Sequence, residues 1–324
     1  MIAALHAAID FRLGLAVPEN ETAFRLINGF SEGLPTLALD IYGRTLVIHD
    51  YADVPDEAQI GELLTVVRSR LPWICSAVLK PRHSGDSDVR SGRVVFGNES
   101  DLPRQIRENG VLYSINLLLN RDTSFYIDTR GLRAWARETL VGKRVLNTFA
   151  YTGSLGVAAR AAPCRQVVTT DLKNRFLALA KESYSLNGFA IRRADFITGD
   201  FFEVIRRLKR DKELFDCVFL DPPFFSSTAK GRVDQGNMKS LINKVRPVVA
   251  PEGFLVVVTN ALFISGKEHM EMLQGLCGDT GMRFERTIDV PQDFVGYAAR
   301  PVWPTDPAPF NHPTKIAVLR TQSY

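Results

Sequence analysis

The sequence has few cysteines and no long apolar run. Its four cysteines are Cys75, Cys164, Cys217 and Cys277. None of them stands in a CxxC or Cys/His spacing, so we expect reduced thiols, a cytoplasmic protein and no metal site. No stretch of about 18 consecutive apolar residues is present, and charged side chains interrupt the apolar N-terminus. The sequence therefore predicts neither a membrane span nor a signal peptide.

The composition excludes a disordered or fibrous protein and leaves the substrate class open. Hydrophobic residues make up 45% and charged residues 23% of the 324 residues, which is typical of a globular protein. Residues 20–120 hold 10 Lys and Arg against 13 Asp and Glu, a net charge of −3. Residues 121–324 hold 29 against 21, a net charge of +8. A basic excess in the second part is compatible with nucleic-acid binding without requiring it.

Two parts of the chain differ in their pattern of apolar residues. Residues 1–120 combine a helical N-terminus, a helical pattern over 56–71 and short strand-like runs, which predicts a small α+β domain. Over residues 121–324, short apolar runs alternate with helical segments, which predicts an α/β fold with a doubly wound parallel sheet. We expect TIDVPQDF and KIAVLR to form the last two strands, and the proline-rich residues 301–313 to form a surface loop.

Candidate cofactor residues lie where three successive strands of this sheet end. Gly153, in the first strand-to-helix turn, lets the backbone approach a ligand where a Cβ would clash. Asp171 ends the second strand, where a carboxylate can accept hydrogen bonds from both hydroxyls of a ribose. After the third strand, Asp200 can accept from the exocyclic amine of adenine while Phe201 covers a face of the ring. Together they describe an adenosine-shaped site; a tight turn at Gly153 and a helix N-cap at Asp171 are the structural alternatives.

The fourth strand ends in Asp221, Pro222, Pro223 and Phe224. Two consecutive prolines fix φ and remove two backbone donors, so the carbonyl groups of a rigid turn are left to face the site. With the Asp221 carboxylate, these carbonyls can hold an amine or a ring nitrogen, and Phe224 offers a face on which a planar base can stack. The alternative is a plain proline turn after a buried strand. The GxGxxG and GK[ST] patterns are missing, so an NAD-dependent dehydrogenase is the least favoured enzyme class.

These motifs resemble those of class I S-adenosylmethionine-dependent methyltransferases. More closely, they are similar to bacterial large-subunit (23S) ribosomal RNA methyltransferases, whose Rossmann-like domain follows a small α+β domain. The similarity covers residues 20–320 and rests on Arg25–Gly43, Phe125–Arg130, Leu146–Ser154, Leu186–Gly188, Asp221–Phe224, Asp171 and Asp200. The resemblance implies S-adenosyl-L-methionine as the cofactor. The contacts that it implies are Asp128, Arg130, Asn147, Phe149, Tyr151, Thr152, Gly153, Asp171 and Asp200. Several relatives begin with an RNA-binding PUA domain, which we do not expect in this sequence.

The sequence favours a nitrogen over a carbon as the methyl acceptor. Methylation of cytosine C5 requires a cysteine nucleophile, which relatives with that chemistry carry just after the fifth strand. Residues 257–261 read VVTNA at that position, and Cys217 falls within the apolar fourth strand. A nitrogen has its own lone pair, so transfer needs mainly positioning and the exclusion of water. Asn260 and the segment Pro291–Phe294 are similar to the branch that methylates guanine N7 in ribosomal RNA. A polar turn between strands is the alternative for Gln292–Phe294.

RNA is the expected partner, ribosomal RNA in particular, and the sequence indicates neither a membrane partner nor an oligomeric state. A base of folded RNA must be splayed out of its stack to reach the site. The candidate RNA contacts are Lys80, Arg82, His83, Lys230, Arg232 and Asn260. We interpret the basic cluster Arg206–Arg210 as a solvated helix face. Methylation of a protein side chain or a small metabolite is the enzymatic alternative. A non-catalytic RNA-binding protein is disfavoured because Asp171, Asp200 and Asp221 are all present.

Overall fold

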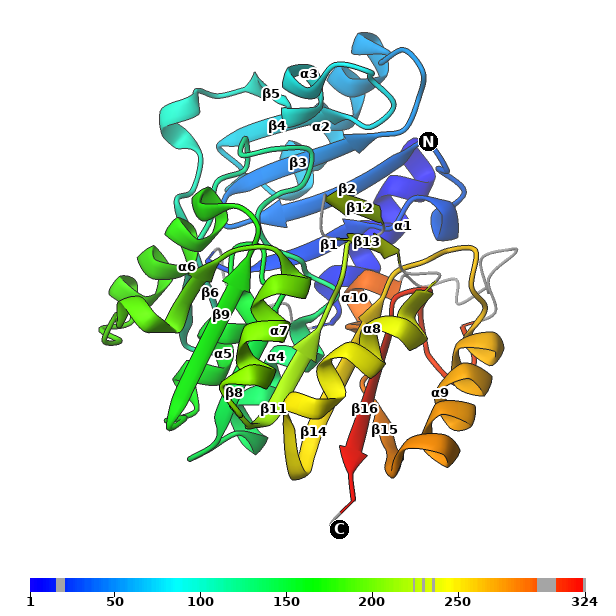
Figure 1. Cartoon of the computed structure of the whole chain (residues 1–324). Helices are drawn as coiled ribbons and strands as arrows, with labels where there is room; N and C mark the ends of the chain where they lie inside the picture. The colour runs from blue at the N-terminus through cyan, green and yellow to red at the C-terminus, as the bar shows by residue number, and fades with distance from the viewer. Residues whose placement is uncertain (16–20, 224, 229–230, 235–236, 296–306, 323–324) are drawn as a thin grey trace. The chain divides into compact units, whose positions relative to one another are not determined.

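The computed structural model of the chain describes residues 1–15, 21–223, 225–228, 231–234, 237–295 and 307–322, without the side chains of 225–228, 231–234, 279 and 280. The chain forms two compact units (Figure 1). The first comprises Met1–Asp128 and Pro291–Arg300, and the second comprises Thr129–Val290 and Pro301–Tyr324. The first unit thus extends beyond the boundary expected at residue 120 and takes in a segment from near the C-terminus.

The first unit is built on a five-stranded sheet in the order β1-β2-β3-β4-β5. Neighbouring strands are antiparallel except β3 and β4, which are parallel and joined by α2. Helices α1 and α2 pack on this sheet through an apolar cluster that includes Ile9, Leu39 and Leu63. The elements of this unit are α1 (Ile2–Leu13), β1 (Ala23–Ile27), β2 (Leu37–Tyr42), β3 (Thr45–Asp50), α2 (Glu57–Arg70), β4 (Ser76–Pro81), α3 (Ser87–Ser91), β5 (Arg93–Phe96), β6 (Gln105–Glu108), β7 (Val111–Ser114) and α10 (Gln292–Val295).

The second unit contains a seven-stranded sheet in the order β10-β9-β8-β11-β14-β16-β15. Its first five strands are parallel, and β16 runs antiparallel to both of its neighbours. The elements of this unit are α4 (Arg130–Thr139), β8 (Arg144–Thr148), α5 (Ser154–Ala161), β9 (Gln166–Asp171), α6 (Asn174–Leu186), β10 (Phe196–Thr198), α7 (Phe201–Arg210), β11 (Phe215–Leu220), β12 (Phe225–Thr228), β13 (Gly231–Asp234), α8 (Met238–Val245), β14 (Val249–Thr259), α9 (Gly266–Thr280), β15 (Met282–Thr287) and β16 (Lys315–Thr321).

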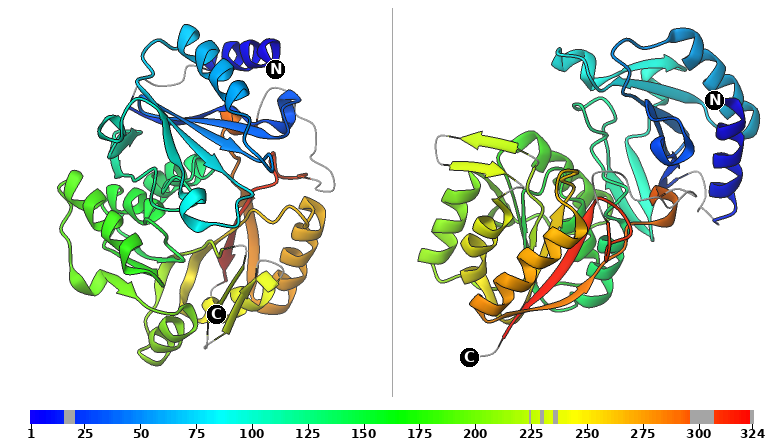
Figure 2. Two further views of the ribbon diagram at one scale, coloured as in Figure 1. Left: turned by 90° about the horizontal axis from the view of Figure 1, so that it is seen from above. Right: turned by 90° about the vertical axis from the view of Figure 1, so that its right-hand side faces the viewer.

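Helices cover both faces of this larger sheet (Figure 2). On one face, α7, α8 and α9 pack against strand residues such as Val218, Leu255 and Ala317. On the other face, α4 and α5 pack against residues such as Cys217 and Val256. Successive strand residues point to opposite faces, so the continuous apolar runs of the sequence are buried on both sides, as expected for a doubly wound sheet. Among the described residues, no helix combines the length and the apolar character that crossing a membrane requires.

Most of the expected elements are present, with one clear exception near the C-terminus. Strands and helices alternate over residues 130–259 as expected, and KIAVLR lies in β16. The expectation that TIDVPQDF forms a strand is wrong, because β15 ends at Thr287 and Gln292–Val295 form the short helix α10. Pro291 has no backbone N–H and cannot continue a strand ladder there. Residues 301–306 of the expected proline-rich loop lie outside the described residues.

Candidate active site

The carboxyl ends of five parallel strands meet at one edge of the second unit's sheet. Leu220 ends β11 and lies opposite Thr148 of β8 and Val257 of β14, while Thr198 ends β10 opposite Asp171 of β9. The chain order reverses beside β8, which has β9 on one side and β11 on the other, and doubly wound sheets bind ligands at such a point. The predicted residues that end or follow these strands, and so share this edge, are Asp171, Asp200, Asp221 and Asn260.

The loop between β8 and α5 has a strained backbone. Phe149 and Tyr151 have positive φ angles of 50° and 51°, and Gly153 has a φ of 79°. A residue with a side chain loses about 1–2 kcal/mol in this left-handed region, and such strain gathers at functional sites. A Cβ on Gly153 would lie 2.6 Å from the Cβ of Ala180 in α6, so glycine is required there. No amino-acid pattern predicts this conformation at two aromatic residues.

Asp171 links this loop to the start of α6 through two hydrogen bonds. Its Oδ2 accepts a hydrogen bond from the backbone N–H of Tyr151 at 2.8 Å, and its Oδ1 accepts one from the N–H of Lys173 at 2.9 Å. Burial raises the pKa of this carboxyl, and the two N–H donors act in the opposite direction. The next residue, Leu172, is 48% exposed and presents an apolar surface beside the carboxylate. Leu172 is not among the residues predicted from the sequence. The sequence feature that could have indicated it is an apolar residue in a turn, where a polar residue is usual.

The residues after β10 are engaged within the protein. Asp200 caps α7, because its Oδ1 accepts hydrogen bonds from the N–H groups of Phe202 at 2.9 Å and Glu203 at 3.4 Å. Phe201 is 7% exposed and stacks on Phe149 with ring centroids 4.5 Å apart. The prediction that Phe201 covers a ligand ring directly does not fit this burial. Phe201 instead supports the half-buried ring of Phe149.

The other predicted cofactor residues differ in exposure. Asn147 is 1% exposed, and its Nδ2, which has no hydrogen-bond partner among the described residues, would lie 3.2 Å from a Cβ placed on Gly156 of α5. Thr152 is 5% exposed. Asn147 therefore lies beneath the loop rather than on its surface. Asp128 is the last residue of the first unit and Arg130 the first residue of α4, and both are half-buried.

The Asp-Pro-Pro motif follows β11 directly. Asp221 is half-buried, Pro222 is buried and Pro223 is exposed. Asn260, which is also exposed, follows β14 on the neighbouring strand. The predicted residues that lie outside the described part of the chain are Phe224, Lys230 and, for its side chain, Arg232 of β13. The motif and Asn260 therefore flank the same stretch of the sheet edge.

Two cysteines of the second unit are buried thiols. Burial raises the pKa of Cys217, within β11, well above its ordinary value and raises that of Cys164 to about 11. Both thiols are neutral at pH 7, so neither is the thiolate that attack on cytosine C5 requires. Among the described residues, no group of His, Cys, Asp and Glu side chains is arranged to hold a metal ion.

Lys80 lies in the interior of the first unit, which corrects the prediction that it contacts RNA. Its side chain is fully buried, and its Nζ donates to the carbonyl groups of Ser91 at 2.8 Å, Asn120 at 2.8 Å and Asp122 at 3.3 Å. Arg82 donates to the carboxylate of Asp122 at 3.3 Å and is itself largely buried. Both cations bind the segment that leads towards Asp128, a role that the sequence alone does not distinguish from a basic surface.

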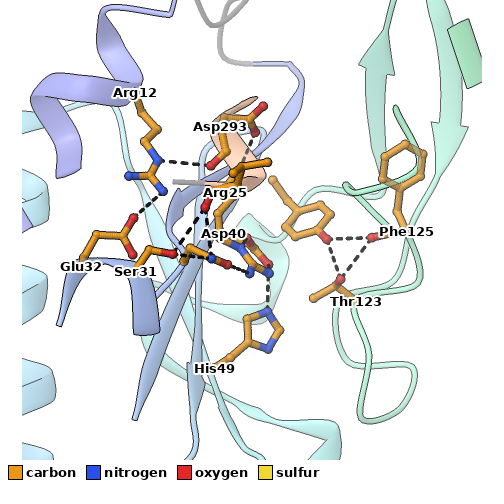
Figure 3. A network of polar contacts seen from close by, with 12 residues as sticks. Arg12, Arg25, Ser31, Glu32, Asp40, His49, Thr123, Phe125 and Asp293 are labelled. Atoms are coloured by element: carbon orange, nitrogen blue, oxygen red, sulfur yellow. Dashed lines mark hydrogen bonds and ion pairs between the residues drawn. The ribbon is translucent and has the colours of Figure 1, made fainter. Parts of the chain in front are cut away.

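The predicted segment Gln292–Phe294 belongs to a polar network of the first unit (Figure 3). The Oδ2 of Asp293 accepts from the backbone N–H of Arg25 at 3.0 Å, and its carbonyl accepts from the Nε of Arg12 at 3.2 Å. Arg12 also pairs with Glu32 at 2.6 Å, and both side chains are fully buried. Asp293 is 5% exposed, so its carboxylate is committed to this network.

Comparison with known proteins decides the family. Residues 76–294, more than half of the chain, match the S-adenosylmethionine-dependent methyltransferases. The chain belongs to this family.

The methyltransferase is 28% identical over 302 residues to Ribosomal RNA large subunit methyltransferase I of Erwinia tasmaniensis, covering 92% of this chain and 75% of the relative. It is 28% identical over 309 residues to the protein of that name from Yersinia pseudotuberculosis, with the same two shares covered. Its fold is similar to that of a protein assigned as a methyltransferase and solved with SAH, with a TM-score of 0.84. The two sequences are 23% identical, and the match covers 99% of this chain and 80% of that chain.

S-adenosylmethionine is accordingly the methyl donor, and the residues of the sheet edge fit it. The half-buried Asp171 carboxylate can accept hydrogen bonds from ribose hydroxyls, and Leu172 presents an apolar surface next to it. Among the described side chains none caps the start of α5 by a hydrogen bond, and the backbone N–H groups there carry the positive end of the helix dipole and favour a carboxylate. When bound, the sulfonium of the cofactor supplies an activated methyl group.

Proposed function

We propose that this methyltransferase modifies a nitrogen atom of a ribosomal RNA base, with guanine N7 favoured over cytosine C5. The observation that carries the proposal is the Asp221-Pro222-Pro223 turn directly after β11, at the edge where β8 also ends, with no cysteine beside Asn260. The relatives named as large-subunit ribosomal RNA methyltransferases support RNA as the substrate. The basic excess of residues 121–324 supports the same substrate class.

In this proposal the adenosine part of the cofactor lies along the ends of β9 and β10. Asp171 accepts from the ribose hydroxyls, and Asp200, whose Oδ1 already caps α7, presents its carboxylate towards the adenine amine. The strained loop after β8 holds the cofactor through its backbone. The remaining proposed contacts are Asp128, Arg130, Phe149, Tyr151, Thr152 and Gly153.

The acceptor side needs to hold, orient and desolvate a base rather than activate it. The Asp221 carboxylate and the carbonyl groups of the proline turn accept hydrogen bonds from the donors of the base, which fixes its ring in line for transfer. Attack by guanine N7 uses the nitrogen lone pair and releases no proton, so no general base is needed. The product ring is cationic, and the Asp221 carboxylate stabilises that charge as it develops.

The small domain is proposed as the region that recognises RNA. In the first unit His83 is the exposed candidate, with 54% of its side chain accessible. In the second unit Lys230, Arg232 and Asn260 remain the candidate contacts. The four cysteines are free, which agrees with the proposed cytoplasmic location.

The test is methyl transfer to RNA. Total RNA from a strain lacking this gene is incubated with the enzyme and radiolabelled S-adenosylmethionine, beside RNA from the wild-type strain, and the labelled nucleoside is identified by mass spectrometry. We expect label in the RNA of the deletion strain only, in a nucleoside methylated at nitrogen. Label in protein alone would refute the RNA substrate, and 5-methylcytidine would refute the nitrogen acceptor.

The role of Asp221 is tested by Asp221→Ala. We expect this variant to lose methyl transfer while calorimetry still shows S-adenosylmethionine binding, since the carboxylate acts on the acceptor. The matched control is Asp211→Ala, because Asp211 is an exposed carboxylate of the same unit that pairs with Arg210 at 2.8 Å. Full activity of Asp221→Ala would remove Asp221 from the acceptor site.

A further inference from the structure

A buried lysine begins β16 at the carboxyl end of β14. Lys315 lies opposite Thr259, the last residue of β14, and its side chain is fully buried. Its Nζ donates a hydrogen bond of 2.7 Å to the carbonyl of Pro313 and one of 3.4 Å to the carbonyl of Ala261. The ammonium therefore joins the loop that leaves β14 to the loop that enters β16.

Lys315 lies on a face of the sheet that carries an apolar core. Ala317, two residues along β16 on the same face, belongs to the core under α7, α8 and α9. The titratable groups that face Lys315 in the described part of the chain are Glu268 and His269 of α9. Burial, followed by the charge of Lys315, lowers the pKa of His269 to about 4, so this imidazole is neutral at pH 7. Glu268 is engaged by Ser265, whose N–H and hydroxyl donate to its Oε2 at 2.8 Å each.

An ammonium in such a place is costly in free energy, and an apolar residue of similar length would suit the core. Burial lowers the pKa of Lys315 to about 8, against the opposing effect of Glu268. The charge is therefore kept at neutral pH in spite of its environment. Because the side chain is fully buried, it cannot touch RNA or cofactor itself, and its action must pass through the carbonyl groups that it binds.

One of those carbonyls belongs to the residue after Asn260. The N–H of Ala261 donates to the Oγ1 of Thr259 at 3.3 Å, so the turn 259–261 is fixed from β14 on one side and by the ammonium on the other. The turn lies at the same edge as Asp221, because β11 and β14 are paired with Leu220 opposite Val257. We propose that Lys315 is a positioning residue that fixes the Asn260–Ala261 turn for the methyl acceptor. This proposal rests on the proposed function in placing the acceptor at this edge.

The pH dependence separates positioning from stability because the two have opposite signs. The unfolded chain binds the Lys315 proton up to a pH near 10.5, whereas the folded chain loses it near 8. Between these values the unfolded state binds more protons, so the Lys315 contribution to stability rises with pH. The ammonium that holds Ala261 is lost over the same range, so methyl transfer falls as pH rises through about 8. A lysine that acted only on stability would cause no loss of methyl transfer over this range, whereas a positioning lysine causes one.

The experiment compares the full chain as wild type, Lys315→Met and Lys315→Arg. The substrates are total RNA from the strain lacking this gene and radiolabelled S-adenosylmethionine. The control is Lys267→Met. This variant removes an ammonium from α9, the helix that faces Lys315, but the Lys267 side chain is 77% exposed. Cofactor affinity is measured by calorimetry, folding by thermal unfolding, and kcat and KM for RNA across pH 6.5 to 9.5.

We expect Lys315→Met to bind S-adenosylmethionine like the wild type and to transfer methyl groups at least about tenfold more slowly, with no further decline above pH 8. Lys315→Arg keeps its charge and should show no decline near pH 8, which also keeps the proposal testable if the methionine variant folds poorly. Wild-type kcat in Lys315→Met with an unchanged pH profile would overturn the proposal, as would an equal loss of cofactor affinity. If the wild type labels only protein, the RNA function fails instead, and the variants are compared on that acceptor.

Discussion

Gly153→Ala probes the loop after β8 most directly. Gly153 has a φ of 79°, and an added Cβ would lie 2.6 Å from the Cβ of Ala180. The left-handed backbone costs an alanine about 1–2 kcal/mol, and crowding in a packed site adds about 1–3 kcal/mol. The free energy of unfolding should therefore fall by about 2–5 kcal/mol, the sum of these two effects.

A matched glycine isolates the contact from the backbone strain. Gly142, between α4 and β8, has a φ of 72°, and nothing lies within 4 Å of a Cβ placed there. Gly142→Ala should cost only the backbone part, about 1–2 kcal/mol. Both substitutions remove the same entropy from the unfolded chain, so that effect cancels in the comparison. The difference between the two variants measures the crowding against Ala180.

The assays are denaturant unfolding and calorimetry with S-adenosylmethionine. Gly153→Ala must shift the loop or α6, so we expect its cofactor affinity to fall by at least about tenfold, which corresponds to about 1.4 kcal/mol. Gly142→Ala should bind the cofactor normally, and Ala180→Gly should restore binding to the Gly153→Ala variant. If both glycine variants lost the same stability and bound the cofactor equally well, the close approach of loop and helix would have no energetic role.

Three further changes test other features of the structure. Asp171→Asn should weaken cofactor binding about tenfold in calorimetry, since hydrogen bonds to a charged acceptor are worth about 1.5–3 kcal/mol; unchanged affinity would place the ribose elsewhere. Burial lowers the pKa of Lys80 to about 7, so the wild type should gain stability as pH rises above 7 towards 10.5. Lys80→Met should reduce this gain in thermal unfolding, and an equal gain in both proteins would contradict the burial of the Lys80 ammonium. Asp293→Ala leaves the N–H of Arg25 without its acceptor and should lower stability by about 1–3 kcal/mol in denaturant unfolding, whereas a neutral result would show that α10 does not stabilise the first unit.

The parts of the fold that were predictable depend on local pattern. The apolar run of β9 ends at Asp171 and that of β11 ends just before Asp221, and alternation with helices assigned both to a parallel sheet. The carboxylates and the proline turn could therefore be placed at one edge of the sheet from the sequence alone. The order β10-β9-β8-β11-β14 then follows from doubly wound topology.

What the sequence did not reveal depends on partners distant in the chain. The N–H of Arg25 meets Asp293 across 268 positions, and no local pattern indicates that α10 completes the first unit. Lys80 lies in a strand beside other charged residues, and only its three carbonyl acceptors show that it is interior. The positive φ of Tyr151 likewise accompanies a hydrogen bond to Asp171, which exists only once β8 and β9 are side by side.

The route of the chain has a consequence for synthesis on the ribosome. The first unit takes α10 from residues 292–295, and the second unit takes β16, which stands between β14 and β15, from residues 315–321. A nascent chain therefore carries both units incomplete until residue 292 has been synthesised, with the Asp293 partner of Arg25 missing in one and the edge of β14 uncovered in the other. The first unit can be completed only after the five parallel strands of the second unit have been synthesised, and a premature stop before residue 290 leaves both units incomplete.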